Sequence, residues 1–271
     1  MSGQYNHELK LERAVQHLER LEAEIERWLG RHPYFLVSKF DPQRGEHSIW
    51  IRPEGEPPAE LGLIIGDCLH NLRSALDSLA YDLARTYQGG PLSPTIAGKS
   101  EFPIFIDPGK FADFRERKIG TIDPRAQADI EGLQPYQERE SFRPHISIMA
   151  RAHPEAYHPL WLLHILSNID KHRERHLTLF GPEAIMYGGN AHFADPEVRD
   201  AASTESSARI LSYRPVDTAA ELNVDFSFAL SVAFEKGPPA FGEPVPRVLW
   251  RIYAFITKDV LPLLTPYLTP R

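Results

Sequence analysis

The feature that most restricts the fold is the stretch 159–176, PLWLLHILSNIDKHRERH, which predicts a helix that is apolar on nearly all sides. Such a helix belongs in a core, and polar side chains on it need partners because burying them unpaired costs free energy. Polar residues nevertheless recur along it at helical spacing, so they share one stripe and indicate where a site could lie. The stripe consists of Trp161, His164, Ile165, Asn168 and His172.

A second long helix is predicted over residues 59–87, and it has the same character. Its leucines form a core face, while a polar stripe carries His70, Arg73, Asp77 and Tyr81, with Asn71 beside it. The simplest geometry packs the two helices with their stripes facing each other. This would bring together His70, Asn71, Arg73 and Asp77 from one helix with His164, Asn168, Asp170, Lys171, His172 and Arg173 from the other.

One hypothesis for this polar centre is purely structural: a buried salt-bridge network, such as Arg73 with Asp77 or Asp170, that fixes the helix register. Metal binding is disfavoured because His164 and His172 lie about 12 Å apart along the helix axis and no Glu-x-x-His occurs there. Ser74 lies near Arg73 and Asp77, but the Gly-x-Ser-x-Gly elbow of a hydrolase is missing. The sequence also contains neither a P-loop nor a dinucleotide-binding glycine motif, so we expect no metal and no cofactor.

The rest of the chain predicts an α+β fold: a bundle of about four long helices with an antiparallel β-sheet inserted before the C-terminal helix. Residues 34–39 and 47–52 predict a hairpin with Gly45 in the turn. Residues 88–137 predict a wrapped lid with short helices at 108–117 and 124–133, the second capped by Asp123.

We expect one domain over 1–271, with the bundle in 1–176 and 244–271. Strands are expected at LTLFG, EAIMYGG, ARILSYRP and NVDFSFALSVAFEKG of a β-rich insertion, 177–243, with 195–207 as an exposed loop.

Charge and composition restrict the classes of function. The formal net charge of −7 argues against a protein that coats nucleic acid through a broad basic face. The single cysteine, Cys68, is interpreted as a packing residue; it excludes an internal disulfide framework and fits a reducing, cytoplasmic setting. The N-terminus lacks the apolar segment of a secretory signal, so we expect no such signal. The sequence also lacks a run of about 18 apolar residues, so we expect no membrane span.

Four sequence blocks, HNLRSALD, FPIF, LQPY and NIDKHR, resemble in this order a family of uncharacterised bacterial proteins. That resemblance implies no known activity. More loosely, a polar helix followed by a helix ending in Asn and a Lys-His-Arg cluster resembles the HEPN superfamily of helical bundles, over the helices and not the sheet. Many HEPN proteins are ribonucleases of toxin and defence systems, and others are non-catalytic.

The HEPN hallmark is an Arg, four to six residues, then a His. Here the corresponding place has Asn168 followed by three residues and His172, whereas Arg151 and His158 fit the spacing in a segment that Pro154 makes a poor helix. The resemblance implies metal-independent RNA cleavage, with a His acting on the 2′-hydroxyl and a cation holding the phosphate. The catalytic candidates are then His172 and Asn168, with Asn168 orienting the His172 ring. The substrate-binding candidates are Arg73, Lys171, Arg173 and Asn71, and the structural network is His70, Asp77, His164 and Asp170.

Two hypotheses about function therefore stay open. The first is a HEPN-like, RNA-cleaving or RNA-binding defence factor. The second is a non-catalytic bundle that binds a partner protein or small molecule under the 88–137 lid, with a purely structural polar centre. Neither involves a membrane, and both leave room for a homodimer.

Overall fold

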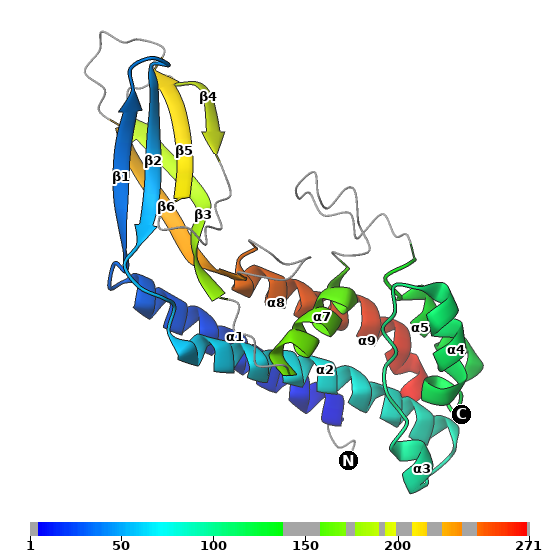
Figure 1. Ribbon diagram of the computed structural model, residues 1–271. Helices are drawn as coiled ribbons and strands as arrows, with labels where there is room; N and C mark the ends of the chain where they lie inside the picture. Colours follow the sequence, from blue (N-terminus) through cyan, green and yellow to red (C-terminus); the bar gives the residue numbers. More distant parts are fainter. Residues whose placement is uncertain are drawn as a thin grey trace. The chain divides into compact units, whose positions relative to one another are not determined.

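The computed structural model describes residues 5–137, 158–171, 177–189, 193–198, 208–215, 224–234 and 243–269, and it has an α+β fold, as the sequence predicts (Figure 1). The chain divides into two compact units, which we call the helical unit and the β unit. The helical unit consists of Met1–Glu19, Ile64–Glu174 and Val248–Arg271, and the β unit of Arg20–Leu63 and Arg175–Arg247.

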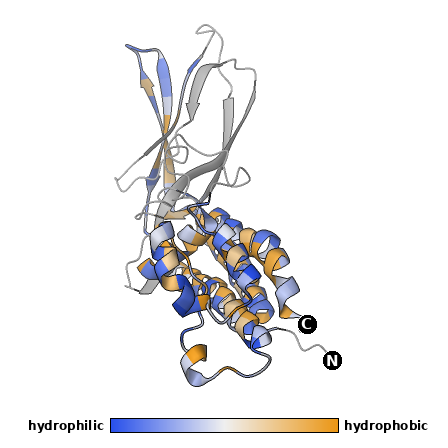
Figure 2. Cartoon of the chain, turned by 90° about the vertical axis from the view of Figure 1, so that its right-hand side faces the viewer, coloured by the Kyte–Doolittle hydropathy of each residue, from blue (hydrophilic) through white to orange (hydrophobic). Residues whose placement is uncertain are grey.

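The long helices form where apolar periodicity predicts them. Helix α1 spans Asn6–Leu29, α2 spans Ala59–Tyr87 and α7 spans Pro159–Lys171. Their leucines at 3- and 4-residue spacing are buried, as Leu18, Leu76 and Leu163 illustrate with no measurable exposure. Figure 2 shows the result, with apolar and polar stretches alternating around the helices.

The 88–137 segment packs into the helical unit as short capped helices. These are α3 (Pro94–Ala97), α4 (Pro108–Ile119) and α5 (Pro124–Gly132). Each begins with a Pro preceded by a residue whose side chain accepts a hydrogen bond from a backbone N–H of the first turn, namely Ser93, Asp107 and Asp123. The predicted cap at Asp123 is confirmed.

The C-terminal helix changes its winding around Pro262. It runs as α8 (Val245–Phe255), a π-helical turn η3 (Ile256–Val260), the short α9 (Leu261–Leu264) and a 3₁₀ turn η4 (Thr265–Leu268). Pro262 has no N–H for the helical ladder and its ring crowds the carbonyl four residues earlier, so the preceding turn widens. The sequence predicts that Pro262 kinks or ends the helix. In the structure the helix continues, and the proline is accommodated by the widened turn before it.

The β unit contains two antiparallel sheets. The first has the strand order β1-β2-β5-β4, and the second pairs β3 with β6. Strands β1 and β2 form the predicted hairpin, with Tyr34 opposite Pro53 and Asp41 opposite Glu46. Gly45 lies in its turn at φ 60°, a conformation that glycine adopts without strain. The six strands are β1 (Tyr34–Asp41), β2 (Glu46–Pro53), β3 (Leu177–Gly189), β4 (Phe193–Val198), β5 (Ala208–Pro215) and β6 (Val224–Phe234).

The strands differ from the sequence interpretation in three ways. The LTLFG and EAIMYGG runs form one strand, β3, with an irregularity between Phe180 and Ala184. Strand β4 occupies part of the segment that was predicted to be an exposed loop. The early hairpin joins the later strands through β2 and β5, a pairing that the sequence did not predict.

Candidate functional site

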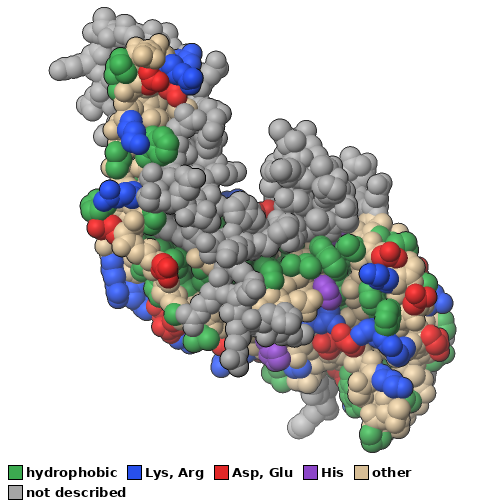
Figure 3. Space-filling model, viewed as in Figure 1, with side chains coloured by type: hydrophobic (Ala, Val, Ile, Leu, Met, Phe, Trp, Pro, Cys, Tyr) green, Lys and Arg blue, Asp and Glu red, His purple; other side chains and the backbone are tan. Residues whose placement is uncertain are grey.

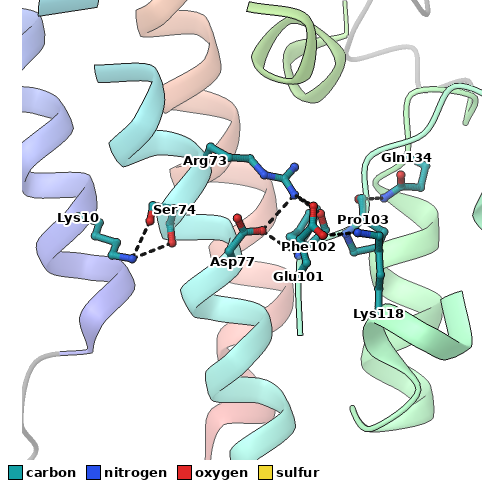
Figure 4. Close-up of polar contacts among 9 residues, drawn as sticks. All are labelled: Lys10, Arg73, Ser74, Asp77, Glu101, Phe102, Pro103, Lys118 and Gln134. Atoms are coloured by element: carbon teal, nitrogen blue, oxygen red, sulfur yellow. Dashed lines mark hydrogen bonds and ion pairs between the residues drawn. The ribbon is translucent and has the colours of Figure 1, made fainter. Parts of the chain in front are cut away.

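The polar stripe of α2 holds the FPIF segment (residues 102–105), which lies outside helices and strands (Figure 4). Arg73 Nη2 donates to the carbonyl oxygen of Phe102 at 2.8 Å, and Asp77 Oδ1 accepts from the Phe102 N–H at 3.0 Å. Phe102 is completely buried, and a buried backbone group without a partner would cost free energy. Arg73 and Asp77 thus supply the hydrogen bonds that a neighbouring strand would otherwise give.

Gln134 holds the same segment from its other side. This residue belongs to the LQPY block and is fully buried. Its Oε1 accepts from the Phe105 N–H at 3.0 Å, while its Nε2 donates to the carbonyl oxygens of Pro103 and Ile130, each at 3.0 Å. The side-chain amide therefore acts as a substitute peptide group. Three of the sequence blocks thus meet in one hydrogen-bonded arrangement, which we call the FPIF clamp and which consists of Arg73, Asp77, residues 102–105 and Gln134.

The charges of the clamp are balanced locally. Arg73 Nη2 lies 3.1 Å from Asp77 Oδ1 and 2.9 Å from Glu101 Oε1, and Glu101 also pairs with Lys118. Burial raises the pKa of the Asp77 carboxyl above its usual value, although the Arg73 charge and the Phe102 N–H partly oppose this shift. Two cations therefore face two carboxylates, and Arg73 and Lys118 are already committed to protein partners.

The other candidates on α2 have separate surroundings. Asn71 Nδ2 donates back to the Asp67 carbonyl oxygen at 2.8 Å, within its own helix, and His70 is exposed. Ser74, which was considered as a nucleophile, accepts from Lys10 Nζ at 2.8 Å, and Ser78 accepts from the same ammonium group. These bonds connect α1 to α2 within the helical unit.

Helix α7 carries a half-buried polar pair. Asn168 Nδ2 lies 3.1 Å from His164 Nε2, one turn earlier, and the His164 ring stacks on Trp161. These residues share one face of α7, as predicted. Arg73 pairs with Asp77, as one form of the structural hypothesis predicts, and both residues also bond to the FPIF segment, which the sequence did not indicate as a partner. The Asp170 and Lys171 side chains, and all of His172, Arg173, Arg151 and Pro154, lie outside the described residues.

A second buried polar pair was missed by the sequence interpretation. His7 Nδ1 lies 3.6 Å from Asp82 Oδ2, and both residues are buried between α1 and α2. Tyr5 stacks on the His7 ring, and Arg85 lies 3.4 Å from the other Asp82 oxygen. The helical spacing of Asp82 and Arg85 was the available signal, although it resembles an ordinary surface ion pair.

The described residues offer few groups for chemistry beyond hydrogen bonding. In the described part of the chain, no three His, Cys, Asp or Glu residues are grouped as metal ligands would be. None of the described helices combines the length and apolarity needed to cross a membrane. Cys68 is fully buried, and this burial raises the pKa of its thiol to about 12, so it is held as an unreactive thiol.

Comparison with known families, with curated proteins and with solved structures found no match in any of the three.

Proposed function

We propose that this protein is a non-catalytic binding module. In this proposal the polar centre of the helical unit is structural, and the edge strand β1 receives a strand from a protein partner. The FPIF clamp supports the first half, because Arg73 and Asp77 are committed to the backbone of one buried residue, Phe102. A side chain that already holds buried backbone in place is not available to bind a substrate phosphate.

The observation that carries the second half is the exposure of β1. Among the described strands, β1 ends its sheet and pairs only with β2. Every residue from Phe35 to Asp41 is exposed, and four of them are large and apolar. Figure 3 shows hydrophobic and basic side chains at the surface of the β unit. The exposed fractions are 47% for Phe35, 46% for Leu36, 38% for Val37 and 56% for Phe40.

An edge strand of this kind is suited to strand addition. It presents a row of unpaired N–H and C=O groups, to which an extended segment can bond while its side chains contact the neighbouring ones. Natural proteins usually protect such edges with charged residues. Between Tyr34 and Phe40 this chain has one charged residue, Lys39, so the edge is largely unprotected.

Site-specific photo-cross-linking in living cells tests this proposal. A photoreactive phenylalanine analogue replaces Phe40 in the full chain, and the matched control places it at Leu9, which is exposed on α1 to 48%. We expect a covalent adduct with a protein of discrete mass from position 40 and none from position 9. Equal labelling at both positions, or no protein adduct at position 40, would contradict strand binding at β1.

RNA cleavage at α7 is a second proposal, and the hydrogen bond between Asn168 and His164 is the observation that favours it. The hydrogen bond to His164 holds the side chain of Asn168 in place, and Asn168 is the residue that orients His172, the acid or base, in the arrangement that the HEPN resemblance implies. In this proposal His172 and Asn168 take part in catalysis while Lys171 and Arg173 hold the phosphate. The test is incubation of total RNA with the wild type, His164→Ala and His172→Ala. Cleavage that His172→Ala abolishes at unchanged stability would support it, and a wild type that never cleaves RNA would refute it.

A further inference from the structure

We infer that the strand received by β1 is the β1 strand of a second copy of this chain, in an antiparallel pair whose two-fold axis passes through Val37. This inference rests on the proposed role of β1 as a binding strand. It adds the identity of the partner and the register of pairing.

The backbone groups that point away from β2 can be identified. The Glu54 N–H donates to the Pro33 carbonyl oxygen at 2.8 Å, and the Ser48 hydroxyl lies 3.5 Å from the Lys39 carbonyl oxygen, so residues 33 and 39 face β2. Successive residues of an antiparallel strand turn their N–H and C=O groups to opposite sides. The outward-facing residues are therefore Tyr34, Leu36, Ser38 and Phe40.

A two-fold axis normal to the sheet restricts how two copies of β1 can pair. It keeps each side chain on its own face, so paired residues must both be even-numbered or both odd-numbered. Centring the axis on Val37 places Tyr34 of one copy opposite Phe40 of the other, and Leu36 opposite Ser38. The two-fold symmetry makes each of these pairs occur twice. All four outward N–H groups and all four outward C=O groups of each copy then find partners.

The side chains favour this register over its nearest competitor. With the axis at Val37, Phe35 of one copy faces Lys39 of the other, and Val37 faces itself. Lys39 Nζ already lies 4.1 Å from the ring centroid of Trp50, so a second aromatic ring would surround its charge. With the axis at Ser38 instead, Phe35 would face the Asp41 carboxylate, and Tyr34 would face Pro42, which has no N–H to donate.

The edge is also limited to one partner strand. Pro33 and Pro42 flank the exposed stretch, and neither can donate to a longer ladder. An isologous pair of this kind closes on itself, because each β1 becomes an interior strand once it is paired. The outcome is a discrete dimer and not an open fibre.

A disulfide placed at the axis tests this register. Two Val37 residues would form a pair without backbone hydrogen bonds between them, with Cα atoms roughly 4.5 Å apart, which is a separation that a disulfide can span. Val37→Cys in the full chain should therefore form a covalent dimer on mild oxidation. Leu36→Cys, which lies on the opposite face and opposite Ser38, is the matched control and should stay largely uncross-linked. Cys68 is buried and should contribute no background.

A proline at position 38 provides a second test. Ser38→Pro removes an outward N–H but no bond to β2, whereas Ser38→Ala keeps that N–H. Sedimentation equilibrium should show a dimer for the wild type and for Ser38→Ala, and a dissociation constant at least about tenfold higher for Ser38→Pro. A circular dichroism spectrum like that of the wild type would confirm that Ser38→Pro is folded.

The possible failures can be told apart. Equal cross-linking of Val37→Cys and Leu36→Cys would overturn the register. A wild type that stays monomeric, combined with cross-linking of position 40 only to other proteins, would overturn the second-copy inference while leaving strand binding by β1 intact. The absence of any adduct at position 40 would overturn both.

Discussion

Arg73 and Asp77, one turn apart on α2, hold the two backbone polar groups of a single residue: Arg73 donates to the Phe102 carbonyl oxygen at 2.8 Å, and Asp77 accepts from the Phe102 N–H at 3.0 Å. The spacing of the pair matches one helical turn, so both side chains reach the same segment. This relationship explains why polar residues occur at regular intervals on a core helix. It also makes the stability of the fold sensitive to each of them.

Replacing Arg73 by Ala should lower the free energy of unfolding by about 2–4 kcal/mol, because it leaves the buried Phe102 carbonyl without its donor and the Asp77 carboxylate without its cation, while Glu101 keeps Lys118. The matched control is His70→Ala, an exposed change on the same helix that should stay within about 0.5 kcal/mol. Urea denaturation measures both. A loss for Arg73→Ala no larger than that for His70→Ala would show that the clamp is not structural.

The Asp77 carboxyl should give the clamp a measurable pH dependence. Its pKa is raised in the folded chain, chiefly by burial, so the folded state holds the proton more tightly than the unfolded state. The carboxyl therefore stabilises the fold most below its ordinary pKa of 3.8, and this contribution is lost as the pH rises through the folded-state pKa. Asp77→Asn keeps an oxygen for Phe102 and removes the titration. The stability of the wild type relative to Asp77→Asn should fall as the pH rises from 3.8, and a rise over that range would contradict this assignment.

Gln134→Ala should cost about 2–4 kcal/mol of unfolding free energy, since it leaves the Phe105 N–H and the Pro103 carbonyl without partners in a buried position. Gln16→Ala, on the exposed face of α1, is the comparison and should be nearly neutral. Thermal denaturation of both variants is sufficient. Similar melting temperatures for the two would mean that FPIF is held by its apolar contacts alone.

Gly45 offers a test of the hairpin turn. At this φ of 60°, a residue with a Cβ destabilises the fold by about 1 kcal/mol relative to glycine. No atom lies close enough to clash with a Cβ at this position. Gly45→Ala should therefore destabilise the chain by about 1 kcal/mol, and Gly45→Asn by less. Gly55 also has open space but no positive φ, so Gly55→Ala should be neutral or slightly stabilising. Equal effects of Gly45→Ala and Gly55→Ala would contradict the turn geometry.

Local pattern was enough to predict most of the elements. The helices follow the 3.6-residue periodicity of their leucines, the cap at Asp123 follows from its place before a proline, and the hairpin follows from alternation around Gly45. The pairing of β2 with β5 could not be predicted from the sequence, because strands separated by many residues carry no local signal of their partner. The alternation of apolar residues with small and polar ones along 224–234 predicts one buried and one exposed face, yet at the end of β6 Ser231 and Ala233 are buried like the apolar residues beside them.

The candidate site was predicted only in part, for a similar reason. The stripe on α2 correctly marked Arg73 and Asp77 as residues that need partners. Their partner, however, is a segment without periodicity, and backbone groups as acceptors or donors leave no mark on the sequence of that segment. Gln134 was likewise part of a quoted block, but nothing in LQPY indicated that its amide would replace a peptide group.

Amide hydrogen exchange along β1 of the wild-type protein, followed by NMR over a range of protein concentrations, tests the claim of strand pairing most directly. Our account predicts that the outward amides of Leu36, Ser38 and Phe40 become more protected as the concentration rises. The amides of Val37 and Lys39, which already face β2, should exchange at rates that stay constant. If the outward amides exchange at the rate of unprotected groups at every concentration, β1 does not pair with a second copy, and the account is wrong.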